Sequence, residues 1–262
     1  MKLSISNIAW TAENDDQMYG LMKKLGFTGL EIAPTRIFPE DPYGNPGRAR
    51  AWKEQLSTGY DFEVPSMQSI WYGRKERLFG TEEERQSLVG YTKKAVDFAE
   101  TIGCGNLVFG CPRNRYLPEG ADESIAVDFF KEIGDYAAAH GTVIAMEANP
   151  PIYNTNYINT TRSALELIER VESPGFLLNL DLGTMIENGE DADVLDGRFS
   201  LIHHVHISEP GLKPLEIRPL HKELCERLAD SHYQGFVSIE MGKTEDINLL
   251  SEKMRYVRSI FG

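Results

Sequence analysis

Four side chains that commonly bind metal ions end successive apolar runs of this sequence: Glu147, Asp181, His206 and Glu240. The runs lie about one strand–helix unit apart, so each run can bring one side chain to a common point. Three carboxylates meeting there beside an imidazole would repel one another, because burying uncompensated charge is costly. A divalent cation removes this conflict, and oxygen ligands with one nitrogen suit Mn²⁺, Mg²⁺, Co²⁺ or Zn²⁺. The pattern therefore predicts a site for one divalent metal ion. Each acidic residue taken alone also fits a helix cap or a partner for a nearby lysine.

The elements that must position these residues alternate along the whole chain. Apolar runs predict strands at residues 3–9, 28–33, 63–69, 106–110, 142–147, 176–181, 201–207 and 236–241. Amphipathic runs predict helices between them, for example at residues 15–25, 122–140 and 161–171. Thr81 and Glu84 predict a capping box at the start of a further helix.

The strand runs are nearly continuous in apolar residues, which is typical of strands covered on both faces. Eight strand–helix units in 262 residues match a (β/α)₈ TIM barrel, which is an α/β fold. We therefore expect a single domain over residues 1–262. A doubly wound open sheet is the alternative, and the absence of a G-x-G-x-x-G turn after the first strand disfavours it.

The composition narrows the choice of partners. The chain carries 27 basic and 40 acidic residues, a net charge of −13, so its average surface repels nucleic acids and anionic membranes. No apolar run approaches the roughly 20 residues that a membrane helix needs, and the first residues lack the features of a signal peptide. The three cysteines have no C-x-x-C spacing and indicate neither a disulfide framework nor a zinc site. We expect a cytoplasmic protein with no nucleic-acid or membrane partner.

Further polar and aromatic residues fall at the carboxyl ends of the predicted strands, where TIM barrels place their active sites. Glu31 and Gln68 end the second and third strands and are candidates to hydrogen-bond substrate hydroxyls. Trp10 and Trp71 follow the first and third strands and are candidates for apolar walls against a sugar ring. Core packing is the competing interpretation for both tryptophans.

Weaker candidates lie near the metal-binding residues. Asn149 follows Glu147 by two positions and either faces the same site or forms a turn. Arg218 follows the seventh strand and either clamps a carboxylate or phosphate or lies in a solvated loop. Residues 113–115 (Arg-Asn-Arg) form a basic spot that either binds phosphate or faces solvent. His204 is interpreted as a structural residue that faces the helical layer.

Five strand-end motifs occur in order: GLEIAP at 29–34, AMEANP at 145–150, LNLDLG at 178–183, HHVHISE at 203–209 and GFVSIEM at 235–241. This ordered set resembles the xylose isomerase-like barrel superfamily of sugar and sugar-phosphate isomerases and epimerases. That superfamily includes ketose 3-epimerases, inosose dehydratases and the endonuclease IV repair enzymes. The resemblance covers essentially the whole chain.

The resemblance implies that Glu147, Asp181, His206 and Glu240 are the metal ligands and that the partner is a small sugar or polyol substrate. It further implies that Glu147 and Glu240 are the acid/base pair that removes and returns a proton through an enediolate. The implied activity is that of a sugar or sugar-phosphate isomerase or epimerase that depends on manganese or a similar divalent ion.

The sequence departs from the family pattern at two places. Members often carry D-x-x-H on the sixth strand, whereas Thr184 stands here at the position of that substrate-facing histidine. The repair enzymes carry further histidine ligands on the third and fourth strands, which end here in SMQS at 66–69 and FGC at 109–111. One metal ion is therefore expected rather than three, and a DNA-repair role is disfavoured.

Two other functions stay open at this point. A lyase similar to inosose dehydratases would use the same site but release water, and Thr184 keeps open a carbohydrate-binding barrel with altered catalysis. Metal-assisted phosphoester hydrolysis usually needs more ligands than the sequence offers. The long segments 34–47 and 70–80 are candidates for a lid or for an interface between copies of the chain.

Overall fold

Seven parallel strands form the central sheet of the computed structural model, which describes residues 1–262. The strands are β1 (Lys2–Ser6), β2 (Gly29–Glu31), β3 (Asn106–Phe109), β4 (Val143–Met146), β5 (Phe176–Asp181), β6 (Ile202–Ile207) and β7 (Phe236–Ile239). Their spatial order is β2-β1-β7-β6-β5-β4-β3. Almost every strand residue is buried, as expected for strands covered on both faces.

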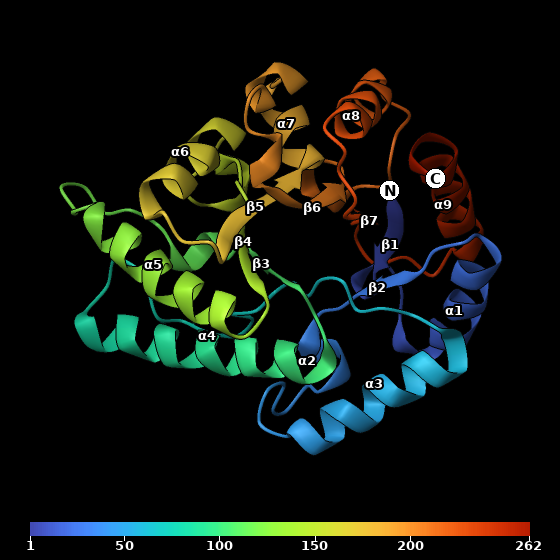
Figure 1. Ribbon diagram of the computed structural model, residues 1–262, viewed down its shortest axis with the longest axis horizontal. Helices are drawn as coiled ribbons and strands as arrows, with labels where there is room; N and C mark the ends of the chain where they lie inside the picture. The colour runs from blue at the N-terminus through green and yellow to red at the C-terminus, as the bar shows by residue number, and fades with distance from the viewer.

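Residues 63–67 close the gap between β2 and β3, where the sequence predicts a full strand over 63–69. This segment makes only isolated parallel bridges, to the β2 side and to β3. Pro65 lies within it and has no N–H to donate, which prevents a continuous ladder. The sheet thereby curls into a barrel with eight members, and the predicted α/β barrel class is confirmed (Figure 1).

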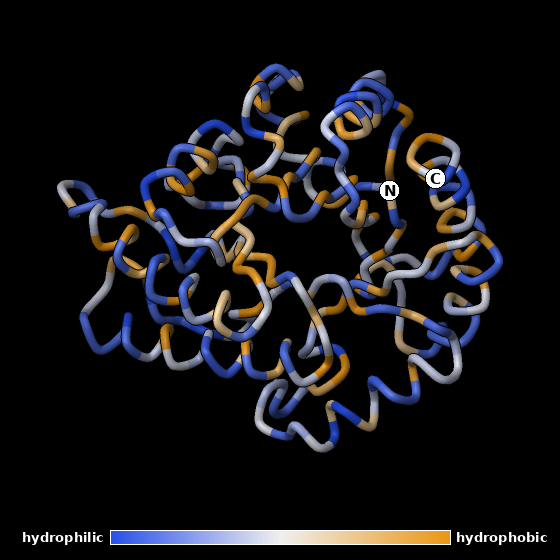
Figure 2. The backbone as a smooth tube through the Cα atoms, in the orientation of Figure 1, coloured by the Kyte–Doolittle hydropathy of each residue, from blue (hydrophilic) through white to orange (hydrophobic).

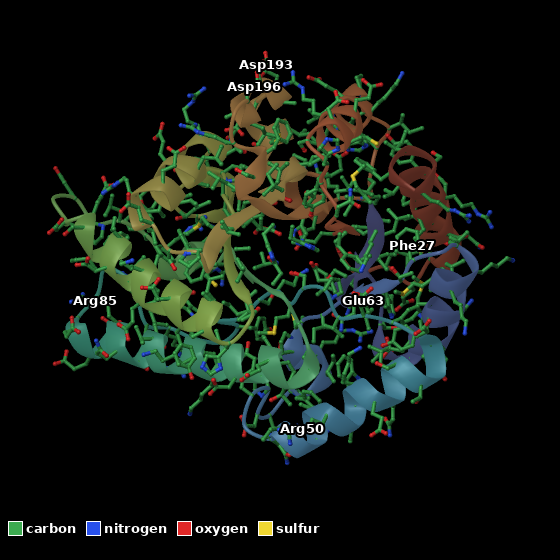
Figure 3. All side chains as sticks on the ribbon, in the orientation of Figure 1. Phe27, Arg50, Glu63, Arg85, Asp193 and Asp196 are labelled. Atoms are coloured by element: carbon green, nitrogen blue, oxygen red, sulfur yellow. The ribbon has the colours of Figure 1, made fainter.

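The helices surround the strands (Figure 1), and their apolar faces turn toward the sheet while their polar faces turn outward (Figure 2). Charged side chains such as Arg50, Asp193 and Asp196 project from the outer layer (Figure 3). None of the helices combines the length and apolar composition needed to cross a bilayer. The helices are α1 (Asp15–Lys24), α2 (Pro34–Ile37), α3 (Pro46–Tyr60), α4 (Glu82–Ile102), α5 (Ser124–Ala139), α6 (Thr161–Val171), α7 (Leu182–Asn188), α8 (Pro219–Asp230) and α9 (Ile247–Phe261).

Helix α3 lies in a region where the apolar periodicity predicts no helix, and α2 occupies the first residues of the predicted loop 34–47. Only Ala49 and Leu56 of α3 are buried, so its apolar stripe is too sparse to stand out in the sequence. The local signals are instead Asn45, which accepts a hydrogen bond as N-cap, and Pro46 at the first helical position. The predicted long segment 70–80 contains neither helix nor strand, as expected.

The predicted capping box of α4 is present. The N–H of Glu84 donates to Thr81 Oγ1 at 3.3 Å, and the N–H of Thr81 donates to Glu84 Oε2 at 2.9 Å. Removing the Thr81 hydroxyl leaves an N-terminal N–H of the helix without a protein partner, so Thr81→Ala should lower the free energy of unfolding by about 1 kcal/mol. Urea denaturation measures this change, with Thr101→Ala at the far end of the same helix as the control. Equal stability of wild type and Thr81→Ala would contradict the prediction.

Candidate active site

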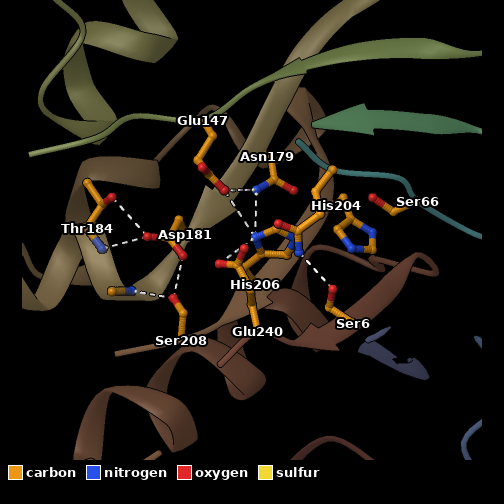
Figure 4. A network of polar contacts seen from close by, with 12 residues as sticks. Ser6, Ser66, Glu147, Asn179, Asp181, Thr184, His204, His206, Ser208 and Glu240 are labelled. Atoms are coloured by element: carbon orange, nitrogen blue, oxygen red, sulfur yellow. Dashed lines mark hydrogen bonds and ion pairs between the residues drawn. The ribbon is translucent and has the colours of Figure 1, made fainter. Parts of the chain in front are cut away.

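The structure brings the four predicted metal-binding residues together at the carboxyl ends of neighbouring strands (Figure 4). Glu147 directly follows β4, Asp181 ends β5, His206 lies on β6 and Glu240 directly follows β7. One ligand atom from each of them lies within 4.8 Å of the others. All four residues are buried, with exposed fractions of at most 9%. Three carboxylate oxygens and an imidazole nitrogen at this spacing form a donor set that fits one divalent cation.

Burial and mutual repulsion raise the pKa values of two of these carboxylates. Burial and then the charge of Glu147 raise the pKa of Asp181 to about 6. Burial also raises the pKa of Glu240 to about 7, with His206 opposing and the other two carboxylates adding to the shift. Burial alone would lower the pKa of His206, but the charges of Glu31 and Glu240 raise it well above its usual value. The cluster thus concentrates more negative charge than its one imidazole can offset.

Glu31 fixes the orientation of His206. Its Oε2 lies 2.9 Å from His206 Nε2, so Nε2 carries the hydrogen and Nδ1 faces the cluster. His206 Nδ1 lies 3.1 Å from Glu147 Oε1 and 3.4 Å from Glu240 Oε2. Burial would raise the pKa of Glu31, but the charges and hydrogen bonds of His206 and His204 outweigh burial and lower it.

Glu31 lies inside the barrel against His206, and Gln68 contacts Glu31 from the lining of the reaction cavity. Glu31 is fully buried, and Gln68 Nε2 donates to Glu31 Oε1 at 3.0 Å and to Ser6 Oγ at 2.7 Å. The interpretation that His204 faces the helices is wrong, because residues two apart on a strand point to the same face. His204 Nε2 lies 3.0 Å from Glu31 Oε2, on the same side as His206.

A buried arginine helps to hold Glu147 in place. Arg115 is fully buried, and it donates to the Glu147 carbonyl oxygen at 2.9 Å and to Asn149 Oδ1 at 2.9 Å. Asn149 Nδ2 in turn donates to Glu147 Oε2 at 3.1 Å. Burial lowers the pKa of Arg115 to about 10, which leaves it charged at neutral pH. The sequence predicts one basic spot at residues 113–115, but of these residues only Arg113 is exposed.

The carboxylate of Asp181 is held by its own helix and by β6. The N–H of Thr184 donates to Asp181 Oδ2 at 2.8 Å, which caps α7. The Ser208 hydroxyl donates to Asp181 Oδ1, and Ser208 itself accepts from the N–H of Gly183 at 2.8 Å. Thr184 is 1% exposed, and its hydroxyl lies 2.7 Å from the Ala148 carbonyl oxygen. The residue at the family's histidine position therefore positions a carboxylate here.

A cavity of about 170 Å³, which we call the reaction cavity, opens onto the cluster. Four carboxylates line it, those of Glu147, Asp181, Glu209 and Glu240, and no lysine or arginine does. Its other polar lining residues are Gln68, Ser69, Asn149, Tyr153 and Ser208. The sequence does not predict Tyr153, Ser208 and Glu209 as site residues. They lie outside the long helices and the strands, where periodic patterns carry no information.

Three predicted substrate-binding residues, Glu31, Trp71 and Arg218, do not line the reaction cavity. Trp71 is 2% exposed, donates from Nε1 to Thr92 Oγ1 on α4 at 2.8 Å, and packs edge-on against Phe109. Arg218 instead donates from Nε to Glu209 Oε1 at 2.7 Å. Arg218 therefore reaches the cavity only through the carboxylate that it holds.

A parallel barrel with a carboxylate–imidazole cluster at the carboxyl ends of its strands defines a TIM barrel with a candidate catalytic centre. Residues 20–260 match the model of the xylose isomerase-like TIM barrel family, so the chain belongs to that family. No curated protein matches the sequence.

Solved structures share this fold at low sequence identity. D-psicose 3-epimerase from Clostridium cellulolyticum H10, determined with D-tagatose, has 18% identity and a TM-score of 0.76, with 100% of this chain and 99% of that chain covered. 3-Keto-D-glucoside 4-epimerase from E. coli has 19% identity and a TM-score of 0.78, with 99% of each chain covered. A probable 3-DHS dehydratase from Bacillus anthracis has 17% identity and a TM-score of 0.70, with 98% of each chain covered.

Proposed function

We propose that this protein is a sugar isomerase or epimerase that requires a divalent metal ion and moves a proton through an enediolate. The observation that carries the proposal is the cluster of Glu147, Asp181, His206 and Glu240, whose three carboxylates line a polar cavity. When bound by these four residues, a divalent ion would supply Lewis acidity toward a ketone and its neighbouring hydroxyl. The fold shared with two sugar epimerases supports the substrate class.

Glu147 and Glu240 are suited to work on opposite sides of a substrate carbon. They follow β4 and β7, and β5 and β6 lie between these strands in the sheet. One carboxylate accepts the proton from a carbon beside the carbonyl, and the other, in its protonated form, donates a proton to the same enediolate. In an epimerase the second proton arrives on the opposite face of that carbon, which inverts its configuration.

The other residues of the site hold this pair in place. Arg115 and Asn149 fix Glu147, while Glu31 fixes the ring of His206. Thr184 and Ser208 donate hydrogen bonds to Asp181 and stabilise its ionised form. The polar lining of the reaction cavity offers hydrogen-bond partners to several sugar hydroxyls.

A panel of ketoses, aldoses and cyclic polyol ketones incubated in D₂O tests the proposal. The protein supplied with Mn²⁺ should incorporate solvent deuterium beside the carbonyl and form an isomer of unchanged composition. A product that has lost one water would show a dehydratase instead, a reaction named for one solved structure of this fold. Absence of deuterium incorporation across the panel would contradict both activities.

A further inference from the structure

A second cavity adjoins the reaction cavity at the same end of the barrel, and we call it the outer cavity. Its volume is about 630 Å³, and it shares the lining residues Ser69, Cys111 and Pro112 with the reaction cavity. The segment 69–75 forms one side, and the loop that follows β3 forms the other. A molecule that occupies the reaction cavity can therefore extend past these shared residues into the outer cavity.

The two cavities have opposite charge. Four carboxylates and no cation line the reaction cavity. Three cations, Arg74, Lys75 and Arg113, and no carboxylate line the outer cavity. This grouping stands out in a chain with a net charge of −13. A phosphate or carboxylate group would be repelled beside the metal-binding cluster and attracted by the outer cavity.

The three cations differ in their freedom to bind a ligand. The guanidinium of Arg74 pairs with Glu76, donates to Ser87 Oγ at 2.8 Å and lies over the Tyr91 ring at 4.7 Å. Lys75 and Arg113 are exposed and form no ion pair within the chain. Tyr72 lies beside them in the lining and is 71% exposed. An amine and a guanidinium at one cavity suit an anionic group on a ligand, and the neighbouring aromatic ring suits the organic part of that ligand.

We propose that the outer cavity binds an anionic group, a phosphate or a carboxylate, on the sugar whose carbon skeleton reacts in the reaction cavity. Lys75 and Arg113 are the residues that recognise this group. The inference rests on the proposed function for the sugar end of the ligand. The substrate is then a sugar phosphate or a sugar acid rather than a neutral sugar.

Binding of inorganic phosphate tests the outer cavity without reference to any reaction. Isothermal titration calorimetry compares wild type with Lys75→Gln/Arg113→Gln, and with Lys24→Gln/Arg50→Gln as a control that removes two exposed charges elsewhere. We expect wild type and the control to bind phosphate, and the Lys75→Gln/Arg113→Gln variant to bind at least about tenfold more weakly, since two charge-assisted contacts are lost. Equal phosphate affinity of all three proteins would overturn the proposed anion site.

Deuterium incorporation then tests the substrate class with a ketose, its terminal phosphate and the corresponding sugar acid. We expect a kcat/KM at least about tenfold higher for one of the two anionic sugars. The Lys75→Gln/Arg113→Gln variant should abolish that preference through KM alone and leave the neutral ketose unaffected. Equal kcat/KM for neutral and anionic sugars in wild type would overturn this inference and leave the proposed function intact. Exchange with no sugar at all, together with phosphate binding that only Lys75→Gln/Arg113→Gln weakens, would overturn the proposed function and support the anion site.

Discussion

Glu240→Gln and Glu147→Gln should each slow inversion of the substrate carbon by about 10²- to 10⁴-fold, the range expected for loss of a general acid or base. An amide of the same size cannot accept or return the proton, so neither variant can carry the proton from one face of the carbon to the other. The measurement is formation of the deuterated isomer in D₂O at saturating Mn²⁺, monitored by nuclear magnetic resonance on the substrate that the panel identifies.

The same two variants should fold at least as stably as wild type. Burial and nearby carboxylates hold the pKa of Glu240 at about 7, so a neutral amide relieves repulsion in the metal-free cluster. Thermal unfolding in the presence of a chelator checks this. Glu216→Gln is a matched control, because the Glu216 side chain is 71% exposed and absent from the reaction cavity. Inversion at the wild-type rate in both variants would rule out the acid/base assignment.

Glu31→Gln should weaken metal binding by about 10- to 100-fold, although Glu31 is not among the four residues proposed to hold the ion. The Glu31 carboxylate accepts hydrogen bonds from His206 and His204 and from the amide of Gln68. A glutamine loses the negative charge and one acceptor oxygen, so the His206 ring is no longer fixed with Nδ1 toward the cluster. Competition titration with a fluorescent chelator measures the Mn²⁺ affinity.

Two comparisons separate this orienting role from a general loss of structure. Glu63→Gln, an exposed change near the same strand, should leave the Mn²⁺ affinity unchanged. Glu31→Asp keeps the charge on a shorter side chain and should recover part of the affinity that Glu31→Gln loses. Unchanged Mn²⁺ affinity in Glu31→Gln would show that Glu31 does not orient His206.

The convergence of the four cluster residues was predictable because it follows from chain order. Parallel strands in a barrel place all their carboxyl ends at one rim, so a polar residue at the end of an apolar run must face that rim. This rule alone predicts that Glu147, Asp181 and Glu240 lie at the same rim. The same reasoning predicts that Glu31 faces the rim, but not that it contacts His206 rather than a substrate.

Residues outside the strand pattern were not predictable. Arg115 lies in the loop that follows β3, and no sequence pattern around it indicates that its guanidinium is buried against the Glu147 carbonyl. Trp71 has an aromatic ring suited to a sugar, yet it packs against α4. This contact was not predictable, because it depends on how residues 70–80 cross the barrel end. The sign of the charge on each cavity depends on several loops at once and appears only in the folded chain.

The central claim is that the carboxylate–imidazole cluster holds one divalent ion. Elemental mass spectrometry of the purified protein, before and after incubation with Mn²⁺ and removal of unbound metal, measures this directly. Wild type should retain about one divalent ion per chain, and the Asp181→Ala/His206→Ala variant should retain none, because two of the four ligands are lost. A folded wild-type protein that retains no divalent ion after incubation with Mn²⁺ would contradict the claim and the isomerase proposal that depends on it.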